Sequence, residues 1–261
     1  MHKLFFLCLL LLASSSLSAQ SPYQLNTKKE AIILGAGIAS TSAGVCFRAQ
    51  TPSFTSQELE LLNTQDINAF DRVATKHFSL KAHGVSNYFW YGSQALPFLL
   101  LAGEASRKEL PKLIVLYGET ALLTSGLTLL TKYTVRRPRP FNYDPNTSLA
   151  KKTASNAKAS FFSGHTSITA TNSFFVAKVF SDYYPNSKWK PIVWTAAAAI
   201  PAITGYLRVR GGRHFPSDVI GGYIVGAAVG YLVPHLHRRT KQAKPLTIHA
   251  GFNRVYVGVA F

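Results

Sequence analysis

The sequence predicts an all-α protein, a bundle of about six membrane-embedded helices followed by a short C-terminal β-hairpin-like tail. Three observations predict this fold. Apolar residues make up 47% of the chain and charged residues only 15%, a smaller charged share than soluble domains usually carry. The apolar residues gather into separate blocks, each about long enough for one helix. Residues 246–261 instead alternate between apolar and polar side chains, with the two-residue period of a strand.

Each apolar block predicts one helix, and the blocks lie at residues 31–47, 88–102, 113–130, 167–180, 192–207 and 219–233. Several blocks are rich in small residues, as at Gly222, Gly226 and Gly230, which allow membrane helices to approach closely. A soluble helical bundle is the alternative, because a mean hydropathy of +0.10 is modest for a protein with several spans. Glu119 and Lys178 lie inside predicted helices and fit either that alternative or the interior of a membrane bundle.

The N-terminus is typical of an export signal. His2 and Lys3 precede an apolar run over residues 4–12, and small residues follow up to Ala19, where we expect cleavage. An uncleaved membrane anchor is the alternative. The chain is thus expected to consist of four segments: a signal peptide or anchor (1–19), an N-terminal helix with a polar connecting region (20–87), the main helical bundle (88–236), and a basic tail with a short strand pair (237–261).

The membrane topology contains a conflict. If six helices span and the N-terminus is cytoplasmic, the basic residues at one end of the bundle all face the cytoplasm, as expected for inner-membrane proteins. A cleaved signal would place residue 20 outside. The cleaved signal and the cytoplasmic basic residues are compatible in three cases. Block 31–47 does not cross the membrane, residues 1–19 are not an export signal, or the bundle is soluble. We favour the first case, in which block 31–47 lies along the membrane surface, because it is the least hydrophobic of the six blocks.

The formal net charge of +17 implies a negatively charged partner, such as nucleic acid, anionic lipid headgroups or a phosphorylated substrate. Many basic residues fall within 132–158 and 208–213, and the chain has no aromatic-basic platform typical of single-strand binding. This pattern favours phosphate chemistry and argues against nucleic acid. The two cysteines, Cys8 and Cys46, form no metal-binding pattern.

Three motifs lie where predicted helices meet loops. Residues 132–140 read KYTVRRPRP, residues 160–165 read SFFSGH, and residues 208–218 read RVRGGRHFPSD. Their order and spacing resemble the three signature motifs of the type 2 phosphatidic acid phosphatase superfamily, which includes the vanadium haloperoxidases. Phe162 stands where that family usually has Pro, and Leu207 where it usually has Ser. Both are flanking positions, so the departures bear on loop shape and rate rather than on the reaction.

The basic residues of these motifs suit a phosphoryl group, whose transfer spreads negative charge over its equatorial oxygens. Lys132, Arg139 and Arg208 supply positive charge. Ser163 and the Gly164 backbone N–H, at the start of a helix, add donors that the helix dipole strengthens. These five residues are the predicted phosphate-binding set. Arg136 and Arg137 stay open between this role and that of interfacial anchors.

The resemblance also implies the catalytic residues. His214 would attack phosphorus and form a phosphohistidine. Asp218, one helical turn later, would accept a hydrogen bond from the other ring nitrogen and fix the tautomer. His165 would protonate the leaving oxygen and then activate water. The chemistry requires no metal and no cofactor. The remaining histidines outside the signal are interpreted as structural: His77, His83, His235, His237 and His249.

The function that the resemblance implies is hydrolysis of a lipid phosphate, with an active site on the periplasmic face of the inner membrane. Undecaprenyl diphosphate, phosphatidylglycerophosphate, phosphatidic acid and the phosphates of lipid A are candidate substrates, and membrane lipids are the expected partners. The alternatives are a soluble periplasmic acid phosphatase of broad specificity, a vanadium haloperoxidase, and a non-catalytic module that binds anionic lipid. The lipid and the oligomeric state stay open.

Overall fold

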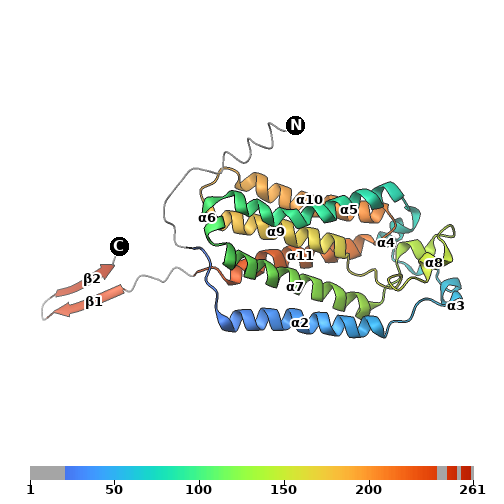
Figure 1. Ribbon diagram of the computed structural model, residues 1–261, viewed down its shortest axis with the longest axis horizontal. Helices are drawn as coiled ribbons and strands as arrows, with labels where there is room; N and C mark the ends of the chain where they lie inside the picture. Colours follow the sequence, from blue (N-terminus) through green and yellow to red (C-terminus); the bar gives the residue numbers. More distant parts are fainter. Residues whose placement is uncertain (1–20, 240–245, 252–253, 260–261) are drawn as a thin grey trace.

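The computed structural model describes residues 21–239, 246–251 and 254–259, so the signal or anchor expected in residues 1–19 lies outside the described chain. Within the described residues, six long helical segments run side by side and confirm the predicted all-α bundle (Figure 1). They are α2 (Thr27–Ala49), α5 (Leu80–Ala95) with its 3₁₀ continuation η3 (Leu96–Ala102), α7 (Leu110–Val135), α9 (Gly164–Tyr183), α10 (Lys190–Arg210) and α11 (Pro216–Leu236).

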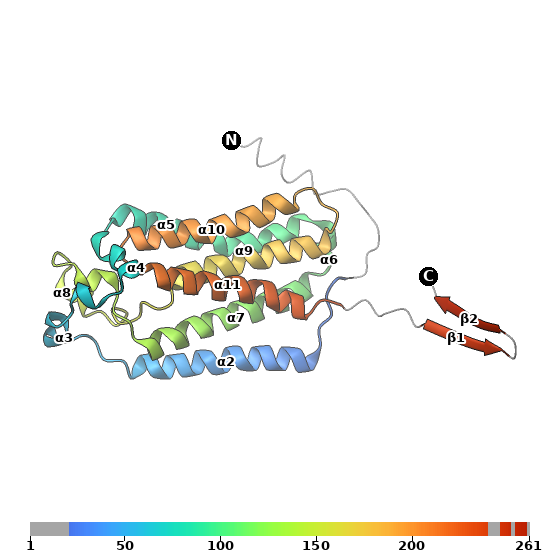
Figure 2. The same ribbon diagram turned by 180° about the vertical axis from the view of Figure 1, so that it is seen from behind.

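Short helices cover the two ends of the bundle. Figures 1 and 2 show α3, α4 and α8 at one end and α6 at the other. The short elements are α3 (Ser56–Glu60), η1 (Thr64–Asp66), α4 (Ala69–Arg72), η2 (Val73–Lys76), α6 (Glu104–Lys108), η4 (Pro140–Tyr143) and α8 (Leu149–Lys152). The end that carries α3, α4 and α8 is called the capped end below.

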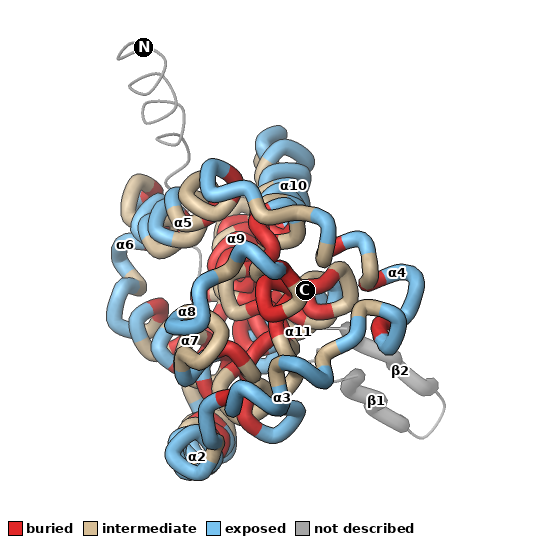
Figure 3. The backbone as a smooth tube through the Cα atoms, turned by 90° about the vertical axis from the view of Figure 1, so that its right-hand side faces the viewer, coloured by how far each residue is buried: buried red, intermediate tan, exposed pale blue. Residues whose placement is uncertain are grey.

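Helix α9 forms the centre of the bundle, and its buried residues appear red in the end-on view of Figure 3. It packs closely on α11 because α11 presents glycines to it. A methyl group on Gly226 would overlap the carbonyl oxygen of Ser167, and one on Gly230 would lie 2.5 Å from that of Thr171. The small residues predicted to allow close approach of helices therefore do so between α9 and α11.

Helix α2 packs in the same way on α7, which contradicts the expectation that block 31–47 lies apart on the membrane surface. The two helices run parallel for most of their length (Figures 1 and 2). Gly37 lies against Leu122, and Gly44 lies against the backbone of Leu130. The expectation was wrong because the helix extends beyond the block at both ends and is no less apolar than α10.

The outside of the bundle is apolar. Among the described residues, four helices are long and apolar enough to cross a membrane, namely α2, α7, α10 and α11. Large hydrophobic side chains are exposed along these helices and along α5, including Ile32, Tyr88, Ile114, Ile192 and Ile224. Contiguous exposed apolar surface of this kind is what a bilayer covers. The protein is a membrane protein.

The predicted C-terminal strand pair is present. Strand β1 (Leu246–Gly251) pairs antiparallel with β2 (Arg254–Val259), with Leu246 opposite Val259 and Gly251 opposite Arg254. The residues between the two strands lie outside the described chain. The proposed division of the chain into four segments stays a prediction.

Candidate active site

All eight predicted site residues lie at the capped end of the bundle, although they come from three separate stretches of chain. Helices α7 and α10 end there, and α9 and α11 begin there (Figure 1). The residues are Lys132 on α7, Arg139 in the following loop, Ser163, Gly164 and His165 at the start of α9, Arg208 on α10, His214 in the next loop and Asp218 on α11.

The end of α7 sets the path of the first motif. Arg136 adopts a left-handed conformation, with φ of 50°, and its N–H donates to the Lys132 carbonyl oxygen. This is a common way to end a helix, and Pro138 prevents its continuation. The loop therefore turns back over the bundle, where Arg139 N–H donates to the Ala157 carbonyl oxygen.

His214 is buried, at 1% exposure, and both of its ring nitrogens are engaged. Its Nδ1 lies 2.9 Å from the Ser160 carbonyl oxygen, which can only accept, so Nδ1 carries the proton. Nε2 then carries the electron pair of the ring and accepts from Arg139 Nη1 at 3.3 Å. Burial, together with the positive charges of Arg139 and Lys132, holds the pKa of His214 well below its usual value. The imidazole is therefore neutral at physiological pH, as a nucleophile must be.

Asp218 supports His214 through Ser160 rather than by the expected direct hydrogen bond. Its Oδ2 lies 3.7 Å from His214 Nδ1, too far for a hydrogen bond. The same oxygen accepts from Ser160 Oγ at 2.6 Å and from Phe215 N at 2.8 Å. Asp218 thus fixes the residue whose carbonyl oxygen holds the imidazole, and it also caps the start of α11.

The sequence left the role of Arg137 open, and in the structure its side chain holds Asp218 in place. Its Nη1 donates to Asp218 Oδ1 at 2.7 Å and its Nη2 to Asp71 Oδ2 at 2.7 Å. Ser217 Oγ also donates to Asp71, at 2.6 Å. Burial alone would raise the pKa of Asp71, but the hydrogen bonds from Ser217 and Arg137 outweigh it and hold the pKa below its usual value. Sequence reasoning missed Asp71, because α4 carries no motif.

The predicted phosphate-binding cations are held by uncharged partners. Lys132 Nζ donates to the Ala159 carbonyl oxygen at 2.9 Å, and Arg139 Nε donates to that of Asn156 at 2.9 Å. Burial lowers the pKa of Arg139 to about 10, which leaves its guanidinium charged at neutral pH. Because these contacts involve no carboxylate, the positive charge stays available to an anion.

Arg208 and His165 connect the site to α5. Arg208 Nη1 lies 3.0 Å from His83 Nδ1 and 3.3 Å from Ser86 Oγ. His165 Nε2 lies 3.0 Å from Asn87 Oδ1. His83, interpreted from the sequence as structural, thus lies at the edge of the site. No sequence motif pointed to Asn87, because α5 lies outside the three motifs.

Ser163, predicted to bind phosphate, also caps the N-terminus of α9. Its Oγ accepts a hydrogen bond from Thr166 N and another, at 2.9 Å, from Thr166 Oγ1, so it is the N-cap of α9. The Ser163 hydroxyl proton can still be donated to an anion. Gly164 lies beside Lys132, where an added methyl group would come 3.6 Å from the Lys132 side chain.

The fold and the site define a membrane protein with a neutral, buried histidine among cations at one end of a helical bundle, an arrangement suited to phosphoryl chemistry. A family comparison agrees with this class. Residues 113–242 match the model of the PAP2 superfamily, so this part of the chain is a PAP2 domain and the protein is a PAP2 superfamily phosphatase.

Two further comparisons complete these findings. Among solved structures, the chain is similar to one described as the first transmembrane PAP2 type phosphatidylglycerolphosphate phosphatase from Bacillus subtilis. The two are 20% identical, the match covers 90% of this chain and 92% of the other, and the TM-score is 0.38. A comparison with curated proteins found no similar sequence.

Proposed function

We propose that this protein hydrolyses a lipid phosphate through a phosphohistidine formed on His214. The observation that carries the proposal is the environment of that ring. The Ser160 carbonyl oxygen holds Nδ1–H and so leaves the electron pair of the ring on Nε2, where it accepts from Arg139 at 3.3 Å. A phosphate group that reaches Nε2 would therefore meet the nucleophile and a cation together.

The reaction follows in two displacements. His214 Nε2 attacks phosphorus and forms the N–P bond while the bond to the leaving oxygen breaks, and His165, which takes up a proton when the anionic phosphate binds beside it, gives that oxygen its proton. Neutral His165 then takes a proton from water, whose oxygen attacks phosphorus and releases His214 and phosphate. Lys132, Arg139 and Arg208 stabilise the charge on the phosphoryl oxygens in both steps. In this scheme the cations of the chain do the work for which other phosphatases use metal ions.

An apolar groove that runs along the bundle, away from the site, supports a lipid substrate. It lies between α5, η3, α9 and α10 and consists of two hollows of about 280 and 690 Å³ that share the lining residues Leu96 and Ile200. The larger hollow extends to Arg107 and Trp189 at the end opposite the site. The smaller hollow begins at Tyr88, next to Asn87, which contacts His165. We propose that a hydrocarbon chain of the substrate lies in this groove while its phosphate reaches His214. Candidate substrates are undecaprenyl diphosphate, phosphatidylglycerophosphate, phosphatidic acid and lipid A phosphate.

Lysines and arginines lie at both ends of the bundle. We assign those at the capped end to the phosphate site and its surroundings, and we take those at the opposite end as the topological signal for a periplasmic active site. At the end of the bundle opposite the site lie many lysines and arginines: Lys28, Lys29, Arg107, Lys108, Lys112, Lys188, Lys190 and Arg238. Such residues favour the cytoplasmic side of the inner membrane. Because α2 runs along the bundle, this orientation places residue 21 in the cytoplasm. We therefore propose that residues 1–19 are not a cleaved export signal.

Phosphate release by the purified full-length protein tests the proposed reaction. Wild type and His214→Ala are assayed, without added metal, on long-chain lipid phosphates and on water-soluble phosphate esters. We expect turnover of the lipids by wild type and a loss of at least about 1,000-fold in His214→Ala, since the nucleophile is gone. His235→Ala, an exposed histidine at the opposite end, serves as the control and should behave as wild type.

Two outcomes would contradict parts of this proposal. Activity that survives in His214→Ala would exclude the phosphohistidine, and equal turnover of soluble esters would point to a phosphatase of broad specificity instead. Added vanadate distinguishes a further alternative, because it should inhibit a phosphatase and activate a haloperoxidase.

A further inference from the structure

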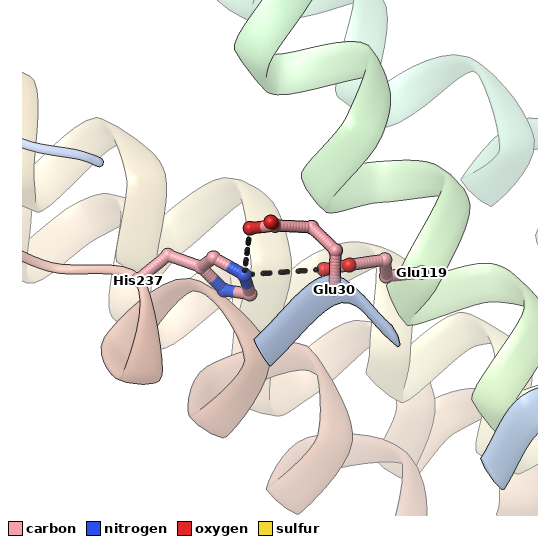
Figure 4. Close-up of side chains that lie close together, drawn as sticks. All are labelled: Glu30, Glu119 and His237. Atoms are coloured by element: carbon pink, nitrogen blue, oxygen red, sulfur yellow. Dashed lines mark ion pairs between the residues drawn. The ribbon is translucent and has the colours of Figure 1, made fainter. Parts of the chain in front are cut away.

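A second cluster of functional side chains lies near the end of the bundle that is opposite the active site. Glu30 from the first turn of α2, Glu119 from α7 and His237 just after α11 point toward one another (Figure 4). His237 Nε2 lies 3.2 Å from Glu30 Oε1 and 3.5 Å from Glu119 Oε2. The side chains of Glu119 and His237 are fully buried, and that of Glu30 is 16% exposed.

The hydrogen bonds of this cluster are incomplete. Among the described residues, neither carboxylate oxygen of Glu119 has a hydrogen-bond partner, and His237 Nε2 has none. His237 Nδ1 lies 2.8 Å from the Val233 carbonyl oxygen and must donate to it, so the Nε2 electron pair of the neutral ring faces two carboxylates. A buried carboxylate without a partner is costly, and a lone pair facing it adds repulsion. The arrangement therefore lacks a positive charge at its centre.

A divalent metal ion would supply the missing positive charge, and the spacing of the three side chains fits its coordination. Two carboxylates balance its charge, and a neutral imidazole supplies the third ligand. Zinc binds nitrogen and oxygen ligands at about 2.0–2.2 Å, and the edge of such a tetrahedron is about 3.4 Å long. The two measured separations from His237 Nε2, 3.2 and 3.5 Å, lie on either side of that edge length, and all three ligand atoms lie within 4.8 Å of one another.

The tautomer of His237 also fits a metal ligand. Histidines that bind metals usually donate their second ring N–H to a carbonyl or carboxylate oxygen, which orients the ring. The Val233 carbonyl oxygen has that role here. On the other side, Glu30 Oε1 accepts from Asn26 N at 2.7 Å, which orients its carboxylate. Both groups are thus held in place by the backbone of the chain.

We propose that Glu30, Glu119 and His237 bind a structural zinc ion, with water completing the coordination. The ion would join α2 to α7 and to the end of α11. Glu30 lies outside the matched PAP2 segment, whereas Glu119 and His237 lie within it. The site would therefore fasten an additional N-terminal helix to the phosphatase domain. His237 would then be a metal ligand rather than the purely structural histidine that the sequence suggested.

Metal binding by the full-length protein in detergent tests the proposal, after removal of the affinity tag and stripping with a chelator. Elemental analysis after equilibration with micromolar Zn²⁺ should find about one zinc per chain, and zinc should raise the unfolding temperature, because an ion that binds only the folded state stabilises it. Co²⁺ should give the visible absorption of a four-coordinate site. His237→Gln and Glu119→Gln should weaken zinc binding by at least about 100-fold, more than the loss of an outer partner usually costs.

His235→Gln is the matched control, because this exposed histidine lies in the last turn of α11 and outside the cluster, and it should bind zinc as wild type does. Glu30→Gln replaces the more exposed ligand and provides a second test if Glu119→Gln fails to fold. Wild type without bound zinc would overturn the proposal and indicate a proton shared between His237 and the carboxylates. Unchanged binding in both glutamate variants would also overturn it. Binding is read without turnover, so the result is independent of the proposed phosphatase reaction.

Discussion

The imidazole of His214 shows how single residues divide the work of this site. One nitrogen is held by a backbone carbonyl oxygen, and the other faces a guanidinium. The sequence placed Asp218 directly on the ring, because the spacing of one helical turn allows that contact. In the structure, Ser160 intervenes, and its hydroxyl donates to Asp218 at 2.6 Å. The carboxylate thus positions a loop, and the loop positions the imidazole that we propose as the nucleophile.

This arrangement predicts unequal effects of two neighbouring substitutions. Asp218→Asn removes the charge that pairs with Arg137 and an acceptor for Ser160, so kcat should fall by about 100-fold or more. Ser160→Ala removes only the hydroxyl and keeps the carbonyl oxygen that holds His214, so its loss should be nearer tenfold. Steady-state kinetics of the two variants with one lipid phosphate provides the measurement. A larger loss in Ser160→Ala than in Asp218→Asn would contradict this account.

At the scale of helices, close packing of α9 on α11 brings the second and third motifs together. Ser163 N–H donates to the Asp218 carbonyl oxygen at 2.9 Å, and a methyl group on Gly222 would lie 2.5 Å from the Ser163 carbonyl oxygen. The two helices can begin side by side only because α11 has no side chain at these points. The glycines of α11 are therefore a requirement for the site as well as for the bundle.

Gly226→Ala should accordingly destabilise the protein. The added methyl group overlaps the Ser167 carbonyl oxygen, and overpacking of this kind costs about 1–3 kcal/mol. Thermal unfolding in detergent provides the measurement. Gly35→Ala on α2 is the matched control, since a methyl group there meets no atom within 4 Å, and its unfolding temperature should stay the same or rise. Equal effects of the two variants would argue against tight packing of α9 on α11.

The groove between α5 and α10 predicts that a side chain placed in it should slow the hydrolysis of lipid phosphates but not that of soluble phosphate esters. Gly92 lines the groove and has open space around its Cα, so Gly92→Phe would fill it with a ring. We expect kcat/KM for a long-chain lipid phosphate to fall at least about tenfold, equivalent to roughly 1.4 kcal/mol of lost apolar burial. Turnover of a short water-soluble ester should not change.

Gly35→Phe, on the outer face of α2, provides the comparison for this experiment, because it adds the same ring to the membrane-facing surface away from the groove. A Gly92→Phe enzyme that hydrolyses the lipid as fast as wild type would place the hydrocarbon chain elsewhere.

For the whole molecule, the apolar surface and the basic residues at the end opposite the site bear on how the bundle would lie in a membrane. The candidate active site is at the capped end, and the basic residues that we take as the topological signal lie at the opposite end. With α2 as one of the crossing helices, both Ser21 and Arg238 lie on the side opposite the active site, where Tyr23 and Arg238 form an isolated bridge.

Cysteine labelling of intact cells tests this orientation. In a background with Cys8→Ser and Cys46→Ser, a cysteine replaces either Gln50 at the capped end or Lys108 on α6 at the other end. A maleimide that cannot cross the inner membrane should label Gln50→Cys, and it should label Lys108→Cys only after the membrane is broken. The reverse pattern would place the active site in the cytoplasm.

The sequence determined the class of fold and supplied the candidate site residues that the bundle brings together, because both depend on local pattern. Apolar blocks of helical length predicted the six long segments, and three motifs at block ends predicted which residues gather. Only the tertiary structure revealed the roles of Asp71, His83, Asn87 and Arg137, since their partners lie far along the chain and follow no periodic pattern. The course of α2 along α7 and the cluster of Glu30, Glu119 and His237 were decided in the same way. Local spacing fixes which face of a helix a residue occupies, but packing between helices fixes what that face meets.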